Sequence, residues 1–263
     1  MSQGKNRRLR RIFRENHRTV VVPMDHGVSI GPVKGIENMQ ETVRRLLKGG
    51  ADAFVLHKGI AKRVDVENAG LIVHLSAISN LTPNCLNKVQ VCTVQEALHL
   101  GADAVSVHVN VGAQDESAML TTLGKVADEC DKFGMPLLAM MYPRGPNIKN
   151  EHDVTAVAHA ARLGAELGAD IIKTNYTGNV ETFKQVVEGC PVPVIIAGGQ
   201  KAETTQQILQ MVYDSMKTGC AGLSIGRNVF QHKNPTSMVR TLVAIVHEGL
   251  SVEQATRLLG ETN

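Results

Sequence analysis

Eight short runs of mostly β-branched and apolar residues recur along the chain, and they constrain its fold more than any other feature. Amphipathic stretches with helical spacing separate most of them, such as Asn38–Lys48, Val154–Leu167 and Glu203–Lys217. Strands that alternate with helices in this way are typical of a parallel sheet. The eight runs are Thr19–Asp25, Ala53–His57, Leu71–Leu75, Ala104–Val109, Pro136–Tyr142, Asp170–Asn175, Pro193–Ala197 and Gly222–Ile225.

A repeated tripeptide precedes several of these runs. Gly-Ala-Asp occurs at residues 50–52, 101–103 and 168–170, and residues 219–222 hold the equivalent place before the last run. A glycine at this point ends a helix and starts the turn into the next strand. The alternative, an open doubly wound sheet, predicts G-x-G-x-x-G after the first strand, where the chain has Met24–Ser29. The sequence therefore predicts an α/β fold, a TIM (β/α)8 barrel.

The chain has 263 residues and no linker rich in Pro, Gly or Ser, which indicates one domain because α/β barrels commonly reach this length. Residues 1–18 form a basic extension that we expect to be helical. Leu9 and Ile12 give it one apolar edge, which we expect to close the lower end of the barrel while the arginines face solvent or a neighbouring subunit. The charge of this segment also raises RNA binding as a non-enzymatic alternative, but the aromatic content of 3% gives that little support.

Composition narrows the function further. A net charge of +3 is too small to indicate a polyanionic partner. The odd number of cysteines and the lack of a C-x-x-C pair favour neither disulfides nor structural zinc, which is typical of a reducing cytoplasm. No apolar stretch approaches the roughly 20 residues that span a bilayer. We therefore expect a cytoplasmic protein with no cofactor and with neither nucleic acid nor membrane as a partner. The cysteines are Cys85, Cys92, Cys130, Cys190 and Cys220.

One lysine interrupts the sixth run. In Asp170–Tyr176, Lys173 stands where a buried parallel strand would carry another branched apolar side chain. Burial lowers the pKa of a lysine toward neutrality and frees its lone pair for attack on a carbonyl. The structural alternative is a side chain that extends to the barrel rim. Lys58 is a rival reactive amine, although Gly59 and Arg63 indicate a wetter loop there. Lys173 thus indicates Schiff-base chemistry.

Two further polar residues end predicted strands. Asp25 ends the first and Tyr142 the fifth, so closure of the barrel brings both to the same mouth as Lys173. A phenol near the reacting carbon can act as a general acid or base, and Asp25 can orient the amine, move protons during dehydration or stabilise an iminium. Alone, Asp25 would equally suit a loop cap, and Tyr142 would suit packing. Together the three residues favour aldol chemistry.

Two glycine-containing turns predict a phosphate site. Gly198 and Gly199 follow the seventh predicted strand, and Gly226 and Arg227 follow the eighth. Many α/β barrels bind phosphate in this region through loop amides and the start of a short helix. Arg227 adds a forked cationic donor, although a surface ion pair is its structural alternative.

Four histidines near predicted strand ends raise the question of a metal. The chain has no H-x-H or H-E-x-x-H spacing. We therefore expect hydrogen-bonded or solvated histidines and no metal site. The four are His26, His57, His74 and His108.

At these motifs the chain resembles the archaeal-type (DhnA-like) class I aldolase family over nearly its whole length. The resemblance rests on Pro23–Ser29, Met141–Gly145, Ile172–Gly178, Ala197–Gly199 and Gly226–Phe230. It implies that Lys173 is the Schiff-base lysine, Tyr142 the proton donor and Asp25 the proton acceptor. It also implies a homo-oligomer, either a pentamer or a decamer. The implied substrate contacts are Asp25, His26, Gly27, Val28, Ser29, Tyr142, Pro143, Arg144, Lys173, Thr174, Asn175, Gly198, Gly199, Gly226 and Arg227.

Within that family the chain is most similar to the 2-amino-3,7-dideoxy-D-threo-hept-6-ulosonate synthases, through Val22–Ser29, Leu56–Gly59 and Val107–Gly112. This implies a transaldol reaction between a phosphorylated ketose, 6-deoxy-5-ketofructose 1-phosphate, and an aldehyde acceptor, L-aspartate semialdehyde. The product feeds an alternative route to 3-dehydroquinate and aromatic amino acids. Residues 75–81 depart from this pattern, because they lack the glycine-rich loop expected after the third strand.

That departure leaves two alternatives open. One is a class I fructose-bisphosphate aldolase. The other is an aldolase that joins L-aspartate semialdehyde to dihydroxyacetone phosphate. All three reactions would use the same lysine, and the choice between acceptor aldehydes depends on one or two hydrogen bonds, worth roughly 1–3 kcal/mol, that leave no fixed motif.

Overall fold

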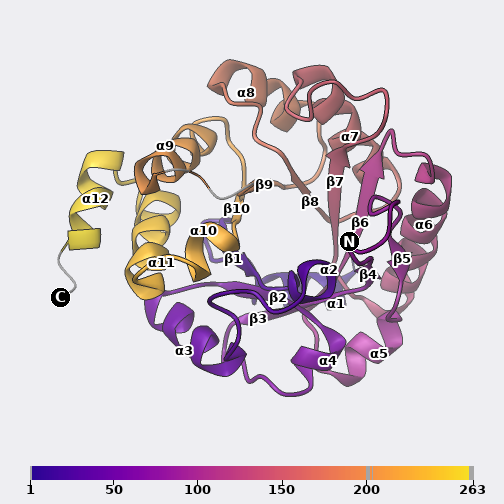
Figure 1. Cartoon of the computed structure of the whole chain (residues 1–263), viewed down its shortest axis with the longest axis horizontal. Coiled ribbons are helices and arrows are strands. Elements are labelled where there is room, and N and C mark those ends of the chain that lie inside the picture. The colour runs from indigo at the N-terminus through magenta and orange to yellow at the C-terminus, as the bar shows by residue number, and fades with distance from the viewer. Residues whose placement is uncertain (1, 200–201, 203, 261–263) are drawn as a thin grey trace.

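The computed structural model describes residues 2–199, 202 and 204–260, and at its centre eight parallel strands form a closed barrel (Figure 1). The predicted TIM barrel is confirmed. Its strands, in order around the barrel, are β1 (Thr19–Pro23), β2 (Ala53–His57), β3 (Gly70–His74), β6 (Ala104–Val111), β7 (Leu137–Pro143), β8 (Ile171–Thr174), β9 (Val194–Ala197) and β10 (Gly222–Ser224). A separate antiparallel pair, β4 (Ser76–Ala77) and β5 (Val89–Gln90), lies between β3 and β6 in the sequence.

Helices surround the barrel. Three of them, α3, α7 and α9, correspond to the stretches that helical spacing predicts, except that Glu203 lies outside the described residues. No helix in the described part of the chain combines the length and the apolar character needed to cross a bilayer. The helices are α1 (Gln3–Leu9), α2 (Gly27–Ile30), α3 (Met39–Gly49), α4 (Lys58–Ala61), α5 (Val94–His99), α6 (Glu116–Phe133), α7 (Val154–Glu166), α8 (Val180–Glu188), α9 (Thr205–Met216), α10 (Arg227–Phe230), α11 (Pro235–Val243), the π-helical turn η1 (Ala244–Glu248) and α12 (Val252–Gly260).

Helix α3 illustrates why these segments are helical. The Asn38 side chain caps its start by accepting a hydrogen bond from the Glu41 N–H. Val43 and Leu46 lie on its buried face. The helix ends at Gly50, whose φ of 92° favours glycine because a Cβ is strained in the left-handed region. This glycine opens the first Gly-Ala-Asp repeat, so the repeat marks the point where a helix stops and the next strand begins.

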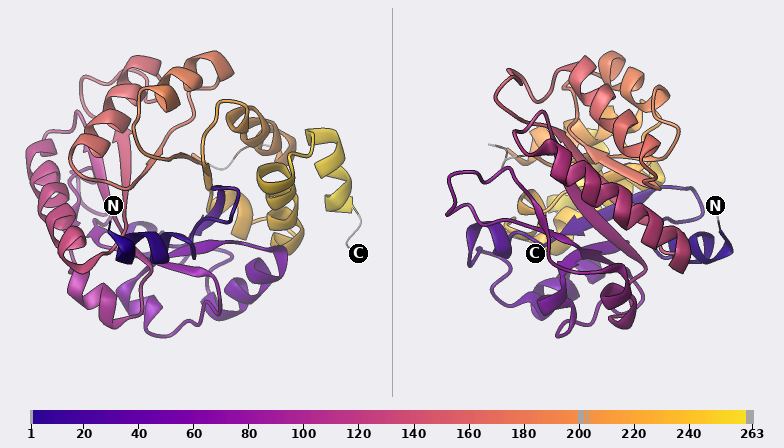
Figure 2. Two further views of the ribbon diagram at one scale, coloured as in Figure 1. Left: turned by 180° about the vertical axis from the view of Figure 1, so that it is seen from behind. Right: turned by 90° about the vertical axis from the view of Figure 1, so that its right-hand side faces the viewer.

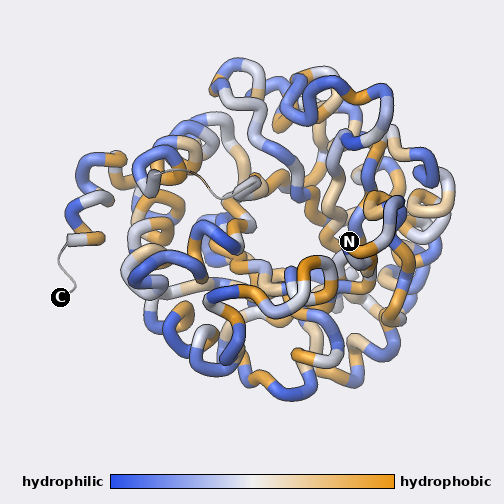
Figure 3. The backbone as a smooth tube through the Cα atoms, in the orientation of Figure 1, coloured by the Kyte–Doolittle hydropathy of each residue, from blue (hydrophilic) through white to orange (hydrophobic). Residues whose placement is uncertain are grey.

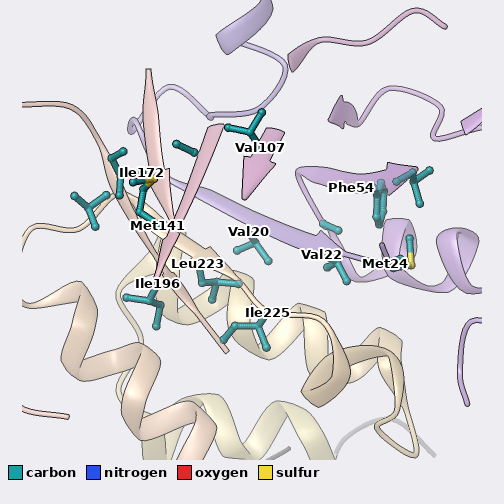
Figure 4. Close-up of a cluster of buried hydrophobic side chains, with 14 of the residues drawn as sticks. Val20, Val22, Met24, Phe54, Val107, Met141, Ile172, Ile196, Leu223 and Ile225 are labelled. Carbon is teal, nitrogen blue, oxygen red and sulfur yellow. The ribbon is translucent and has the colours of Figure 1, made fainter. Parts of the chain in front are cut away.

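Apolar side chains fill both faces of the strands. Val20 and Val22 point outward into the layer beneath the helices, together with side chains from other strands, as Figure 4 shows. Val21, between them, points into the barrel. In Figure 3 the strands are mostly orange to white, whereas the surrounding helices alternate between orange and blue. The helices therefore turn one apolar face inward, as their sequence periodicity predicts.

The N-terminal segment covers the lower end of the barrel. Figure 2 (left) shows α1 lying across that opening. Beyond the helix, Ile12 is only 1% exposed and joins the inward-facing cluster that includes Val21 and Leu138. Leu9 and Phe13 pack against the same cluster. This agrees with the apolar edge seen in the sequence, although α1 ends at Leu9 and Ile12 lies in the turn that follows.

The aspartates of the Gly-Ala-Asp repeats form ion pairs with the N-terminal segment, residues 1–18. Each accepts a hydrogen bond from the N–H of a residue at or near the start of a neighbouring strand, as when Asp170 Oδ2 accepts from Leu137 N at 2.9 Å. Each also contacts a cation of the N-terminal segment. The three ion pairs are Arg14 Nε–Asp52 Oδ1 at 2.5 Å, Arg11 Nε–Asp103 Oδ1 at 3.0 Å and Lys5 Nζ–Asp170 Oδ2 at 2.8 Å.

Arg7, Arg10 and Arg11 are exposed, as expected of arginines that face solvent, but some of the basic residues also form contacts within the fold. Arg8 Nη1 donates to the Gly134 carbonyl at 3.0 Å, and Arg11 binds Asp103. The basic residues are drawn to this end of the barrel because the three repeated carboxylates lie there. These ion pairs neutralise part of the positive charge on which the RNA-binding alternative depends.

Replacing Asp170 by Ala should destabilise the fold strongly. Lys5 is buried, and loss of Asp170 would leave it with only the exposed Asp131, at 2.5 Å, while the Leu137 N–H would lose its acceptor. We expect a loss of about 3 kcal/mol in the free energy of unfolding, measured with urea. The control Asp131→Ala removes the exposed partner of the same lysine and should cost less than about 1 kcal/mol. Equal losses in the two variants would contradict this account of the lower end.

Candidate active site

A cavity of about 920 Å³ opens at the carboxyl ends of the barrel strands. All eight barrel strands contribute to it with a residue at or near their last position. In an α/β barrel this is the face where loop variation builds active sites. The residues that line it from the strands or directly after them include Pro23, Asp25, His57, His74, His108, Met140, Tyr142, Lys173, Ala197 and Ser224.

Lys173 lies in the wall of this cavity on β8, in register with Met140 of β7 and Ile195 of β9. It is 6% exposed. Burial lowers the pKa of Lys173 to about 8; the carboxylate of Asp25 opposes this shift and the guanidinium of Arg144 adds to it. At pH 7 roughly a tenth of the amine is therefore unprotonated, far more than for an ordinary lysine, and the unprotonated amine is the form that attacks a carbonyl.

Asp25 follows β1 and lies between two histidines. Its Oδ1 is 3.7 Å from His26 Nδ1, and its Oδ2 is 3.8 Å from His74 Nε2. Burial opposes ionisation, but attraction to His74, His26, Lys173 and His57 together outweighs burial and lowers the pKa of Asp25 below its ordinary value. The carboxylate is therefore ionised at neutral pH and can hold or accept a proton beside the amine.

Tyr142, near the end of β7, places a phenol in the cavity wall. Burial raises the pKa of Tyr142 above its ordinary value, so the hydroxyl stays protonated. The Arg144 guanidinium carbon lies 4.5 Å from the centre of its ring. Arg144 Nε in turn binds Glu151 Oε2 at 2.7 Å, and Asn175 Nδ2 donates to the same oxygen at 3.3 Å. This chain of contacts fixes the ring and leaves the phenol as a proton donor.

Two histidines of the cavity, His74 and His108, are hydrogen-bonded within the fold, whereas His26 Nδ1 is buried without a hydrogen-bond partner among the described residues. His74 Nδ1 lies 2.8 Å from Ser106 Oγ, and His108 Nε2 lies 2.9 Å from Asn110 Oδ1. Burial lowers the pKa of His74 to about 4 and that of His108 well below its ordinary value, so both are neutral at pH 7. In residues 2–199, 202 and 204–260, no three His, Cys, Asp or Glu side chains form a group that could hold a metal ion.

The two predicted phosphate turns meet on one side of the mouth. Arg227 Nη2 donates to the Gly199 carbonyl at 3.0 Å, and Asn228 Nδ2 donates to the Gly198 carbonyl at 3.2 Å. A Cβ on Gly226 would lie 2.6 Å from a backbone oxygen of β1, so only glycine fits there. The turns after β9 and β10 are thus bound to each other, and Arg227 lines the cavity.

Most residues that the sequence analysis assigns to substrate line this one cavity. They are Asp25, His26, Ser29, Tyr142, Arg144, Lys173, Asn175, Gly198, Gly199, Gly226 and Arg227.

At four positions the structure differs from the expectation, because Gly27, Val28, Pro143 and Thr174 are not part of the cavity wall. Thr174 follows the inward-facing lysine, so strand alternation turns it outward, where its Oγ1 donates to the Met141 carbonyl at 2.7 Å. Gly27 and Val28 are exposed on α2. Pro143 is buried within the last pair of the β6–β7 register.

Other cavity residues were not assigned to substrate from the sequence. Three are histidines at or near strand ends, which the sequence analysis considered as metal ligands but did not assign to substrate. Three more, Asn80, Leu86 and Lys88, lie in residues 78–88, which carry no hydrophobic period. The polar members of this set include His57, His74, Ser76, Asn80, Lys88, His108, Glu151 and Ser224.

Lys58, the alternative reactive amine, lies outside the cavity. Its Nζ binds Glu96 Oε2 at 3.0 Å, its side chain is 40% exposed, and it is not part of the cavity wall. The geometry therefore excludes Lys58 and favours Lys173, whose buried amine lines the cavity with Asp25, as the reactive lysine.

Comparison with known proteins places the chain among aldolases. A model of the DeoC/LacD family of aldolases matches residues 19–232. A 2-amino-3,7-dideoxy-D-threo-hept-6-ulosonate synthase from Halobacterium salinarum is 44% identical over 254 residues, which cover 96% of this chain and 95% of that protein. A 2-amino-4,5-dihydroxy-6-oxo-7-(phosphonooxy)heptanoate synthase from Streptomyces griseus is 40% identical and covers 93% of this chain and 90% of that protein.

Among solved structures, a Schiff-base-forming fructose-1,6-bisphosphate aldolase matches with a TM-score of 0.87 at 31% identity. The match covers 92% of this chain and 100% of that one. The barrel and the order of its elements are therefore shared with an enzyme that forms a Schiff base.

The reactivity of Lys173 should titrate near pH 8. The rate at which a small acylating reagent labels Lys173, followed by peptide mass spectrometry across a pH series, should report a pKa of about 8. Asp25→Asn removes an anion that favours the ammonium and should lower this pKa. Arg144→Gln removes a cation that disfavours it and should raise the pKa. A Lys173 pKa near the ordinary value for lysine, or a higher Lys173 pKa in Asp25→Asn, would contradict the electrostatics described above.

Proposed function

This chain belongs to the DeoC/LacD family of aldolases, and we propose that it is a Schiff-base transaldolase that makes 2-amino-3,7-dideoxy-D-threo-hept-6-ulosonate. Its proposed substrates are 6-deoxy-5-ketofructose 1-phosphate and L-aspartate semialdehyde. The observation that carries the proposal is the buried amine of Lys173, in a cavity that also holds the ionised Asp25 and the protonated Tyr142.

The first half of the reaction cleaves the ketose. Unprotonated Lys173 attacks the ketone carbon, and loss of water from the carbinolamine gives an iminium. Asp25 accepts a proton from the hydroxyl next to the bond that breaks. The electrons of that carbon–carbon bond move to the iminium nitrogen, so an enamine remains on Lys173 and a phosphorylated three-carbon aldehyde leaves. An ionised carboxylate beside a cationic nitrogen also stabilises the iminium.

The second half forms the new bond. The enamine carbon attacks the carbonyl carbon of L-aspartate semialdehyde, and Tyr142 donates its proton to the oxygen that becomes a hydroxyl. Water then attacks the iminium, which releases the product and restores the free amine of Lys173, and return of the proton from Asp25 to the Tyr142 phenolate restores both groups for the next turnover. Burial supports the role of Tyr142, because a raised pKa keeps the phenol protonated until an alkoxide develops next to it.

The turns after β9 and β10 are the proposed phosphate site. Gly198, Gly199 and Gly226 leave the backbone open to close approach, and Arg227 supplies a permanent positive charge at the cavity wall. The mutual hydrogen bonds of these turns support the proposal, because they preorganise the site before the ketose phosphate binds.

Two related reactions use the same residues. The Streptomyces griseus relative, at 40% identity, favours an aldolase that joins L-aspartate semialdehyde to dihydroxyacetone phosphate. The structural match at 31% identity favours a fructose-bisphosphate aldolase. The higher identity, 44%, to the Halobacterium salinarum synthase supports the first proposal over both.

The same proposal covers the compartment, the assembly and the pathway of the enzyme. We propose a cytoplasmic homo-oligomer, a pentamer or decamer, that acts in an alternative route to 3-dehydroquinate and aromatic amino acids. The family resemblance supports the assembly and the route. The five cysteines, all unpaired in the structure, support a reducing compartment.

A panel of donor and acceptor pairs tests the reaction. The purified enzyme should convert 6-deoxy-5-ketofructose 1-phosphate and L-aspartate semialdehyde faster than it cleaves fructose 1,6-bisphosphate or joins dihydroxyacetone phosphate to the same aldehyde, as measured by product mass spectrometry. Lys173→Ala should abolish turnover with every pair while the protein stays folded. Retained turnover in Lys173→Ala would exclude the Schiff-base assignment.

Replacing Tyr142 by Phe should separate the chemical steps. The phenol is needed as a proton donor, so kcat should fall by about 10²- to 10⁴-fold. The iminium on Lys173 should still form, and borohydride should still trap the ketose on the enzyme. Unchanged kcat in Tyr142→Phe would remove the proposed role of this residue.

A further inference from the structure

The segment between β3 and β6 carries a second lysine into the cavity. Residues 78–88 leave the barrel between β4 and β5, and their last residue, Lys88, lines the cavity with Arg144 and Tyr142. The segment therefore places a cation next to the residues assigned to the chemistry.

The backbone on both sides of Lys88 is fixed. Asn110 Nδ2 donates to the Leu86 carbonyl at 2.6 Å, and Val89 pairs with Ala77 in the β4–β5 ladder. At its far end the segment is also bound, since Asn80 N donates to the carbonyl of Ser29 at 2.9 Å. These bonds keep the Lys88 side chain over the cavity, so little backbone order is lost when a ligand binds it.

Lys88 has no direct ion-pair partner among the described residues, although the carboxylate of Asp25, which lines the same cavity, attracts its charge. The neighbouring cation Arg144 is already paired with Glu151 at 2.7 Å. Within the described part of the chain, by contrast, Lys88 forms no ion pair. Burial lowers the pKa of Lys88 below its ordinary value, with Asp25 opposing and Arg144 adding to the shift. A half-buried ammonium without a direct ion-pair partner is costly, and an anionic ligand would offset that cost.

Lys88 lies on the opposite wall from the phosphate turns. Its charge acts on His57, His74 and His108, whereas the charge of Arg227 acts on His26. Figure 1 shows the same separation, with the β4–β5 pair and α10 on opposite sides of the barrel opening. The cavity thus has two cationic ends, with Lys173 and Asp25 also in its wall.

We propose that Lys88 binds the carboxylate of the acceptor aldehyde and so determines acceptor specificity. This inference rests on the proposed transaldol reaction, in which the acceptor is an amino acid semialdehyde. The leaving and incoming aldehydes must share only the position of the reacting carbonyl carbon, so their anionic ends can occupy different sites. The phosphate of the ketose binds at the Arg227 end, and the carboxylate of the acceptor binds at the Lys88 end.

Steady-state kinetics of Lys88→Gln test the proposal. The KM for L-aspartate semialdehyde should rise about 10- to 100-fold, the size expected for loss of one charge-assisted hydrogen bond. The KM for the ketose phosphate should change less than about threefold. Lys88→Arg keeps a cation and should restore most of the affinity. Lys149→Gln removes an exposed lysine that is not part of the cavity wall and should behave as the unmodified enzyme does.

An uncharged acceptor distinguishes binding from a general defect. With propanal in place of the semialdehyde, Lys88→Gln and the unmodified enzyme should react at equal rates. Equal rises in both KM values would assign Lys88 to the ketose phosphate and overturn the proposal, as would an unchanged KM for the semialdehyde. Borohydride trapping of the ketose on Lys173 keeps the two proposals separate, because its absence in the unmodified enzyme would refute the transaldol reaction itself.

Discussion

The burial of one amine at the carboxyl end of β8 is the constraint on which the rest of the site depends. Lys173 is 6% exposed, and burial lowers its pKa to about 8. A fully charged ammonium there would be costly and unreactive, whereas a neutral amine is tolerated and nucleophilic. The same low exposure keeps the Tyr142 phenol protonated and His74 neutral. One physical effect therefore prepares a nucleophile and an acid together.

The two ends of the barrel use charge for different purposes. At the lower end, Asp52, Asp103 and Asp170 bind both strand N–H groups and N-terminal cations, which stabilises the fold. At the upper end, Asp25 stays ionised, and Lys88 stays without an ion-pair partner among the described residues. Unbalanced charge there is available to a substrate. This division matches the general separation of stability and function in α/β barrels.

Much of this arrangement follows from local sequence patterns. The eight runs of β-branched and apolar residues, the helical stretches between them and the Gly-Ala-Asp repeats predict the barrel, and polar residues in or directly after the strands identify Asp25, Tyr142 and Lys173. Lys88 could not be found in this way, because it enters the cavity from residues 78–88, whose position depends on distant partners such as Asn110. The ion pairs of the N-terminal segment escape local patterns for the same reason, since Lys5 and Asp170 are 165 residues apart.

The most direct test of the account is chemical trapping of the covalent intermediate. The enzyme would be incubated with 6-deoxy-5-ketofructose 1-phosphate and sodium borohydride, and the site of the adduct located by intact mass and peptide mapping. We predict one adduct per subunit, on Lys173. An adduct on Lys58 or Lys88 instead, or no adduct with any phosphorylated ketose while turnover continues, would contradict the central role of the buried amine.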